Sequence, residues 1–253
     1  MTTHPHAKRL IYAADMTFEK DMTVKAMIEH ATAELDRCCE AFDGLGITIK
    51  GNTIFRLLGA TALLQLEKAK CDVFGDYKLF DVQSTCINDG SWLQNIRNLE
   101  ILTVNADVHP NVFTKFAEML PNTIVAPIKP LTDLTDEVFE SRGEANRASA
   151  VRKFFQQVMQ VQSNGAICSP KDLELAPSGF QTARTIITPG IRPLYTFVSD
   201  DTNAVNALTP QKAIFAGSDR LVVGSPVRFR NQMRRNAIRI LDEIGAAVEE
   251  KAV

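Results

Sequence analysis

The chain is poor in the residues from which metal sites and hydrolytic triads are built. Among its 253 residues there are four histidines and one tryptophan. His4 and His6 fall in residues 1–9, which we expect to be a flexible N-terminal tail, and this leaves His30 in a predicted helix and His109 just after a predicted strand. A Ser-His-Asp triad and a histidine-rich metal site are hard to build from so few side chains. We therefore expect no metal.

Other absences narrow the class of protein further. No apolar run approaches the roughly 18 residues of a membrane span, and the first ten residues lack the apolar core of a signal peptide, so we expect a cytoplasmic protein without membrane contact. A formal net charge of −2 gives no global field for nucleic acid. The cysteines show no CxxC spacing, which predicts free buried thiols rather than disulfides or zinc ligands. They are Cys38, Cys39, Cys71, Cys86 and Cys168.

Nucleotide-binding glycine motifs are also missing. No GxGxxG and no GxxxxGK[ST] occurs, which argues against a dinucleotide-binding or P-loop domain, and we expect no cofactor. What is present is an alternation of short apolar runs with longer segments of helical period. The apolar runs are residues 10–14, 46–50, 71–80, 99–105, 123–128, 165–169, 183–190 and 219–225. Eight such units in one chain predict a single-domain (β/α)8 TIM barrel over residues 1–253, because parallel strands need crossover helices.

Polar residues close most of these runs, and in a barrel the active site lies at the carboxyl ends of the strands. Asp76 and Lys78 are two positions apart, so in an extended chain they share one face, whereas Asp81 has the opposite parity. Two aspartates about 4 Å apart would repel by roughly 4 kcal/mol at an effective dielectric of 20. Alternation with Lys78, and with Lys50 from the neighbouring strand, is the arrangement that electrostatics favours. We therefore predict a lattice of lysines and aspartates.

The sequence resembles the orotidine 5'-monophosphate decarboxylase family. The resemblance spans nearly the whole chain and rests on motifs at the predicted strand ends: AAD at Asp15, TIKGN at Lys50, DxKxxD with DVQST from Asp76 to Thr85, LT at Thr132, ICS at Ser169, TPGIRP at 188–193 and VVGSP at 222–226. The motif DxKxxD also marks keto-gulonate-phosphate decarboxylases and hexulose-phosphate synthases. Those relatives carry an acid in place of Lys50 and use magnesium, so Lys50 favours the metal-free branch.

The resemblance implies a reaction and an assembly. The reaction is loss of the C6 carboxylate of orotidine 5'-monophosphate to give UMP in pyrimidine biosynthesis, with Lys78 as proton donor and without a cofactor. The assembly is a homodimer with shared sites, in which one subunit supplies Lys50, Asp76 and Lys78 and the other supplies Asp81 and Thr85.

By the same resemblance, further residues bind the substrate. Asp15 reaches the ribose hydroxyls, Thr132 and Ser169 lie near the pyrimidine and the rim, and Arg192 is the cation on the phosphate side. The turns that complete this set are Pro189-Gly190 and Gly224-Ser225.

The chain departs from the family pattern where the phosphate binds. The family places an arginine after the glycine of the eighth strand, where this chain has Ser225, and a glutamine in the seventh loop, where residues 194–210 contain none. Three interpretations remain open. Arg228 or Arg230 replaces the lost charge; or the substrate is a related pyrimidine nucleotide or nucleoside with an altered 5' group; or the protein is a binding relative without catalysis. The basic cluster that includes Arg228 is interpreted as a solvated helix face rather than a nucleic-acid site.

Overall fold

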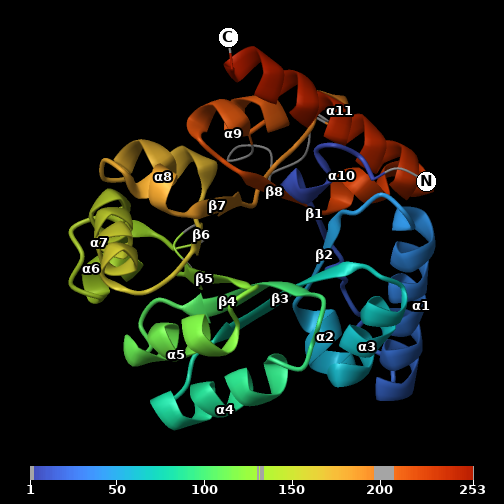
Figure 1. The fold of residues 1–253 in the computed structure, drawn as a ribbon, viewed down its shortest axis with the longest axis horizontal. Coiled ribbons are helices and arrows are strands. Elements are labelled where there is room, and N and C mark those ends of the chain that lie inside the picture. Colours follow the sequence, from blue (N-terminus) through green and yellow to red (C-terminus); the bar gives the residue numbers. More distant parts are fainter. Residues whose placement is uncertain (1–2, 130, 132–133, 197–207, 253) are drawn as a thin grey trace.

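The computed structural model describes residues 3–129, 131, 134–196 and 208–252. Eight parallel strands form one sheet, in the order β5-β4-β3-β2-β1-β8-β7-β6, and curl into the ring at the centre of Figure 1. The strands are β1 (Leu10–Ala13), β2 (Thr48–Gly51), β3 (Asp72–Leu79), β4 (Leu99–Asn105), β5 (Ile124–Ile128), β6 (Gly165–Ile167), β7 (Thr185–Thr188) and β8 (Arg220–Val223). Seven of them lie within the predicted runs, β2 extends one residue beyond its run, to Gly51, and the predicted (β/α)8 barrel is confirmed.

Helices surround the ring on its outer side (Figure 1). They are α1 (Val24–Phe42), α2 (Thr53–Leu58), α3 (Ala60–Lys68), α4 (Gln83–Leu93), α5 (Asn111–Met119), α6 (Asp136–Ser141), α7 (Arg147–Gln160), α8 (Phe180–Ala183), α9 (Pro210–Ala216), α10 (Ser225–Arg228) and α11 (Met233–Lys251). The chain also has short 3-10 helices, namely η1 (Ala7–Arg9), η2 (Pro170–Leu175), η3 (Leu194–Thr196) and η5 (Phe229–Asn231). No helix among the described residues is long and apolar enough to cross a membrane.

The barrel is nearly closed, and its seam lies between β5 and β6. Among the described residues no backbone ladder joins these two strands. The side chain of Asn164 spans the seam instead: its Oδ1 accepts from the backbone N–H of Val125 at 2.8 Å, and its Nδ2 donates to the carbonyl of Thr123 at 3.1 Å. At the next residue, Gly165, a Cβ would lie 2.4 Å from Ile124, so only glycine permits this approach. The side chain of Asn164 thus replaces missing ladder bonds.

Alternate residues of each strand fill the barrel interior, as the period of two requires. Buried apolar side chains from β1, β3, β4, β5, β6, β7 and β8 form this inner cluster: Ile11, Ala13, Phe74, Ile101, Ala126, Ile167, Ile187 and Val222. Residues two positions further along the same strands also face inward and lie nearer the carboxyl ends. The inner layer therefore directs Asp76, two after Phe74, and Thr103, two after Ile101, toward the mouth of the barrel.

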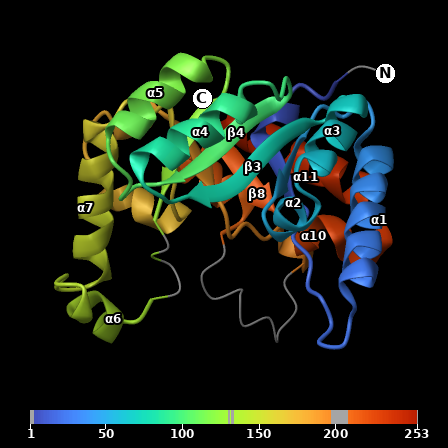
Figure 2. The ribbon, with the colours of Figure 1, turned by 90° about the horizontal axis from the view of Figure 1, so that it is seen from below.

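The carboxyl ends of the strands define one side of the molecule. In Figure 2 the segment between β1 and α1, and also α6, project from the lower side, which is the side where the strands end. The opposite end is closed by Lys8, whose ammonium lies 2.6 Å from Asp72 and 2.9 Å from Glu100. Because Lys8 and the buried Ala7 belong to η1, the later part of the segment predicted as a flexible tail is attached to the barrel.

Candidate active site

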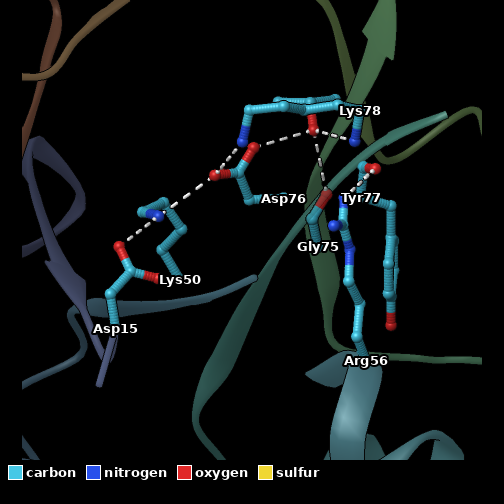
Figure 3. A network of polar contacts seen from close by, with 8 residues as sticks. Asp15, Lys50, Arg56, Gly75, Asp76, Tyr77 and Lys78 are labelled. Atoms are coloured by element: carbon cyan, nitrogen blue, oxygen red, sulfur yellow. Dashed lines mark hydrogen bonds and ion pairs between the residues drawn. The ribbon is translucent and has the colours of Figure 1, made fainter. Parts of the chain in front are cut away.

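Three strands bring a chain of alternating charges to the mouth of the barrel (Figure 3). The ammonium of Lys50, on β2, lies 2.8 Å from Asp15 Oδ2 and 3.0 Å from Asp76 Oδ2. The ammonium of Lys78, on β3, lies 2.8 Å from the same Asp76 oxygen. Asp15 follows β1, so neighbouring strands supply successive members. The predicted lattice of lysines and aspartates is present, in the order Asp15, Lys50, Asp76, Lys78.

Burial and charge fix the protonation of this lattice. Asp76 and Lys50 are only 6% and 8% exposed. Burial alone raises the pKa of Asp76, but the attraction of Lys50 and Lys78 outweighs it, and the pKa lies below the ordinary value. Burial likewise lowers the pKa of Lys50, but Asp76 and Asp15 outweigh it and the pKa is raised. At neutral pH the inner pair is therefore carboxylate and ammonium.

Strand β3 is irregular where it carries Lys78. The backbone of Lys78 has φ +51°, in the left-handed region, and the pairing of β3 with β4 shifts register between Gly75 and Leu79. A regular extended chain, which the parity argument assumed, is therefore wrong for this part of β3. Asp76 and Lys78 do meet, but through a bulge in the strand. Left-handed backbone is uncommon for a residue with a side chain and clusters at functional sites, where the surroundings hold it.

Thr103, on β4, holds the bulge and is a site residue that sequence reasoning missed. Its hydroxyl donates to Asp76 Oδ1 at 3.0 Å and accepts from the backbone N–H of Lys78 at 2.9 Å. The side chain is fully buried. A signal was available, because Thr103 is a polar residue inside an apolar run and has the same parity as Ile101, which faces the barrel interior.

One carboxylate oxygen of Asp15 accepts no hydrogen bond from the described residues. Its Oδ2 receives the ammonium of Lys50, but its Oδ1 is buried and has no hydrogen-bond partner among the described residues. The backbone carbonyl of Asp15 accepts from the guanidinium of Arg228 at 2.5 Å. A buried acceptor without a donor is costly unless a ligand supplies one. Asp15 is therefore fixed by protein contacts on two sides, with Oδ1 left for a donor from a ligand.

Asp81 and Thr85 lie outside the lattice of this subunit. Both side chains are exposed, and Asp81 Oδ1 accepts from the backbone N–H of Val82 at 2.7 Å, just before α4. Their large apolar neighbours Phe80 and Val82 are 65% and 66% exposed. The predicted supply of Asp81 and Thr85 to a second subunit stays a prediction.

The residues expected on the substrate side surround the same mouth. Ser169 precedes η2 and accepts from the backbone N–H of Lys171 at 3.3 Å. Gly190 follows β7 with φ +78°, a conformation that favours glycine, next to the exposed Pro189. Arg192 is half-buried, and its backbone N–H binds Leu208. Predicted position Thr132 lies outside the described residues, as do Asp200 and Asp201 of the seventh loop.

Two arginines, Arg228 and Arg230, follow the altered turn after β8. Gly224 and Ser225 begin α10, and Ser225 is exposed. Arg228, at the end of α10, contacts the carbonyl of Asp15 and lies 3.9 Å from the buried Glu34. The guanidinium of Arg230 lies 5.1 Å from the ring centre of Phe229, and Arg230 is exposed. Arg228 thus reaches the rim, where it contacts the residue that follows Ala14 after β1.

Together, the barrel and the lattice define a class of enzyme that holds fixed ammonium groups beside a substrate at the carboxyl ends of the strands. Comparison with known proteins identifies the family. The model of the "Orotidine 5'-phosphate decarboxylase / HUMPS family" matches residues 8–240, and the chain belongs to this family. Family and fold together support a decarboxylase, which is a carbon–carbon lyase.

Curated relatives agree at low identity. The chain is 27% identical over 227 residues to an orotidine 5'-phosphate decarboxylase of Saccharophagus degradans, covering 83% of this chain and 89% of the relative. It is 26% identical to that of Haemophilus influenzae, covering 87% and 91%. The crystal structure of the Lactobacillus acidophilus orotidine 5'-phosphate decarboxylase matches with a TM-score of 0.72 at 19% identity, covering 94% and 99%. This last likeness supports the fold.

Proposed function

We propose that the protein decarboxylates orotidine 5'-monophosphate to UMP, a step of pyrimidine biosynthesis, in the cytoplasm. One observation carries the proposal. The buried carboxylate of Asp76 lies between two ammonium groups, at 3.0 Å from Lys50 and 2.8 Å from Lys78, in a chain that belongs to the family. The unbound Oδ1 of Asp15 is an acceptor suited to a ribose hydroxyl.

The lattice supplies the groups that such a reaction needs. The bond between C6 and the carboxylate breaks and CO2 leaves. The electron pair of the broken bond stays on C6. Lys78, whose side chain is 34% exposed, stabilises this carbanion and then transfers an N–H proton to C6. Asp76, beside the departing carboxylate, repels it in the ground state. Because Lys50 and Thr103 hold Asp76, and Asp76 holds Lys78, the ammonium is oriented before the substrate arrives.

Lys50 bears on the choice between metal-free and magnesium-dependent chemistry. Its ammonium lies between the carboxylates of Asp15 and Asp76, and it neutralises both. A divalent cation bound by these two oxygens would have to displace a charge that is already hydrogen-bonded to them. We infer that Lys50 takes the place of the metal that the related magnesium enzymes use.

We infer also that the protein works as a homodimer with shared sites. Asp81 and Thr85 are exposed and lie outside the lattice, and the adjacent Phe80 and Val82 expose most of their apolar surface. Exposed apolar residues next to charged ones are typical of an interface. In the dimer, the partner's copies of this segment would complete the site.

A second candidate substrate is a related pyrimidine nucleotide or nucleoside with a different 5' group. The observation that favours it is the position of the arginines, because Ser225 stands at the β8 turn while Arg228 contacts Asp15 and Arg230 lies over Phe229. An arginine contact with a phosphate dianion is stronger than a neutral hydrogen bond, so its loss at this turn weakens the case for a 5'-phosphate.

The experiment that separates these candidates follows the loss of the orotate chromophore with two substrates. We expect turnover of orotidine 5'-monophosphate at least a hundredfold faster than turnover of orotidine, since phosphate binding energy can assist catalysis. Equal rates would favour the second candidate. Turnover of neither by the folded protein would contradict the decarboxylase assignment and favour a binding relative.

A further inference from the structure

A buried carboxylate that the proposed reaction does not use lines the same cavity as Asp15. It belongs to Glu34, on α1, which is 4% exposed. Its Oε1 accepts from the hydroxyl of Tyr12, on β1, at 2.7 Å, and its Oε2 lies 2.5 Å from Nη2 of Arg37. Nη1 of Arg228, on α10, lies 3.9 Å from Oε1. Because a buried carboxylate needs such partners, α1, β1 and α10 meet at this side chain.

Asp15 lies where the sheet no longer fixes the backbone. The N–H of Ala14 donates to the carbonyl of Lys50 at 2.9 Å, and residues 14–19 have no regular secondary structure. Two contacts hold Asp15 itself. The ammonium of Lys50 binds its carboxylate at 2.8 Å, and Nη1 of Arg228 donates to its carbonyl at 2.5 Å. A hydrogen bond from a charged donor is stronger than a neutral one, so Arg228 contributes strongly to the backbone position of Asp15.

Two oxygens, one on Asp15 and one on Glu34, fix the guanidinium of Arg228. The side chain of Arg228 is 36% exposed and borders a cavity of about 420 Å³, which Arg37 also lines. Because open space borders the side chain there, packing alone does not set its position. The carbonyl of Asp15 and the carboxylate of Glu34 therefore determine where the guanidinium lies.

We propose that Arg228 is a positioning residue for Asp15 and that Glu34 holds Arg228 in place. The inference rests on the proposed function, in which Asp15 binds a ribose hydroxyl through Oδ1. The bond from Arg228 to the carbonyl orients the backbone of Asp15, and this orientation directs Oδ1 toward the ribose. Arg228 then acts on ribose binding rather than on the phosphate.

The first test measures kcat/KM of the full-length protein for orotidine 5'-monophosphate and for orotidine. Arg228→Gln should lower both values about tenfold, because both substrates carry the ribose hydroxyls and a bond to a charged group is lost. Glu34→Gln keeps an acceptor for Tyr12 but removes the charge beside Arg228, and it should lower both values about threefold. If Glu34→Gln does not fold, Arg228→Gln alone decides the question.

The matched control is Arg37→Gln, which removes the other guanidinium at Glu34 and makes no contact with Asp15 among the described residues. It should leave both values of kcat/KM unchanged. An equal loss in Arg37→Gln would overturn the proposal. A loss in Arg228→Gln that is confined to the phosphorylated substrate would overturn it as well, and would mean that Arg228 binds the phosphate.

A double-mutant cycle tests whether Arg228 acts through Asp15. In the Asp15→Ala background, Arg228→Gln should change kcat/KM by less than about twofold, since the side chain to be positioned is missing. Losses that add in the double variant would mean that the two residues act independently, and the proposal would be wrong.

Hydrogen exchange gives a readout that does not depend on turnover. The backbone amides of residues 15–20 should exchange several-fold faster in Arg228→Gln than in the wild type or in Arg37→Gln, because the segment loses its bond to α10. Unchanged exchange in Arg228→Gln would overturn the proposal. A wild type without decarboxylase activity would contradict the proposed function, and exchange alone would then decide whether Arg228 fixes Asp15.

Discussion

At the scale of single residues, Lys78 is the group whose removal tests the chemistry most directly. Its side chain is one-third exposed, so Lys78→Ala leaves the core intact, and Asp76 keeps its contacts with Lys50 and Thr103. We expect decarboxylation to fall by roughly 10²–10⁴-fold or more, since a general acid and a fixed cation are lost together. Initial rates, with circular dichroism melting to verify the fold, measure this. Undiminished turnover would remove Lys78 as proton donor.

Asp76 gives a prediction for pH. Its pKa is lower in the folded protein than the ordinary 3.8, so its contribution to stability is complete above that value and is lost as pH falls through the folded pKa. Asp76→Asn should cost about 3 kcal/mol at pH 7, because two ammonium groups lose their shared carboxylate. This gap from the wild type should narrow by about 1.4 kcal/mol per pH unit below 3.8.

Urea unfolding of both proteins from pH 7 to pH 3 measures this gap. The Asp76→Asn variant is the reference for the wild type, because all the other carboxylates are common to both chains and cancel in the difference. A gap that stays constant down to pH 3 would mean that Asp76 is not held ionised by Lys50 and Lys78.

At the scale of elements, the irregular end of β3 depends on β4 for its shape. Thr103→Val keeps the volume of the side chain but removes both the donor to Asp76 and the acceptor for the backbone N–H of Lys78. We expect a loss of about 1–3 kcal/mol in the free energy of unfolding, and a lower kcat with little change in KM, because Lys78 is less well positioned.

A matched variant separates stability from positioning. Thr123→Val removes another buried hydroxyl, which donates to the carbonyl of Leu99 at 2.8 Å near the opposite end of the barrel. It should cost a similar amount of stability and leave kcat unchanged. If both variants lower kcat equally, Thr103 acts only through stability.

The same strand shows how far sequence reasoning reaches. The apolar runs locate all eight strands because burial on both faces leaves a plain pattern. Alternation of charge predicts that Lys50, Asp76 and Lys78 gather, since like charges must be kept apart. The backbone of Lys78 is not predictable in this way, because a left-handed lysine has no local signature and is held by Thr103 from another strand. Likewise, the position of Arg228 over Asp15 depends on tertiary packing with Glu34.

At the scale of the whole molecule, the proposed homodimer predicts that each site draws on two subunits. Two single variants test this prediction. Lys78→Ala disables a site through its own subunit, whereas Asp81→Ala, if shared sites exist, disables the site of the neighbour. Asp81 is exposed, and among the residues that the structure describes its side chain accepts only from the backbone N–H of Val82, so its removal should leave the barrel folded.

A heterodimer of these two variants, purified with different tags, should therefore recover about half of the wild-type activity, because one of its two sites contains both Lys78 and the partner's Asp81. The matched control is a heterodimer of Lys78→Ala with Asp76→Asn. Both of those residues serve the same subunit's site, so neither site is complete and activity should stay at the level of the single variants. Recovery in the first pair alone would establish sharing. Absence of recovery in both, with a dimer verified by light scattering, would place Asp81 in the site of its own subunit and contradict sharing.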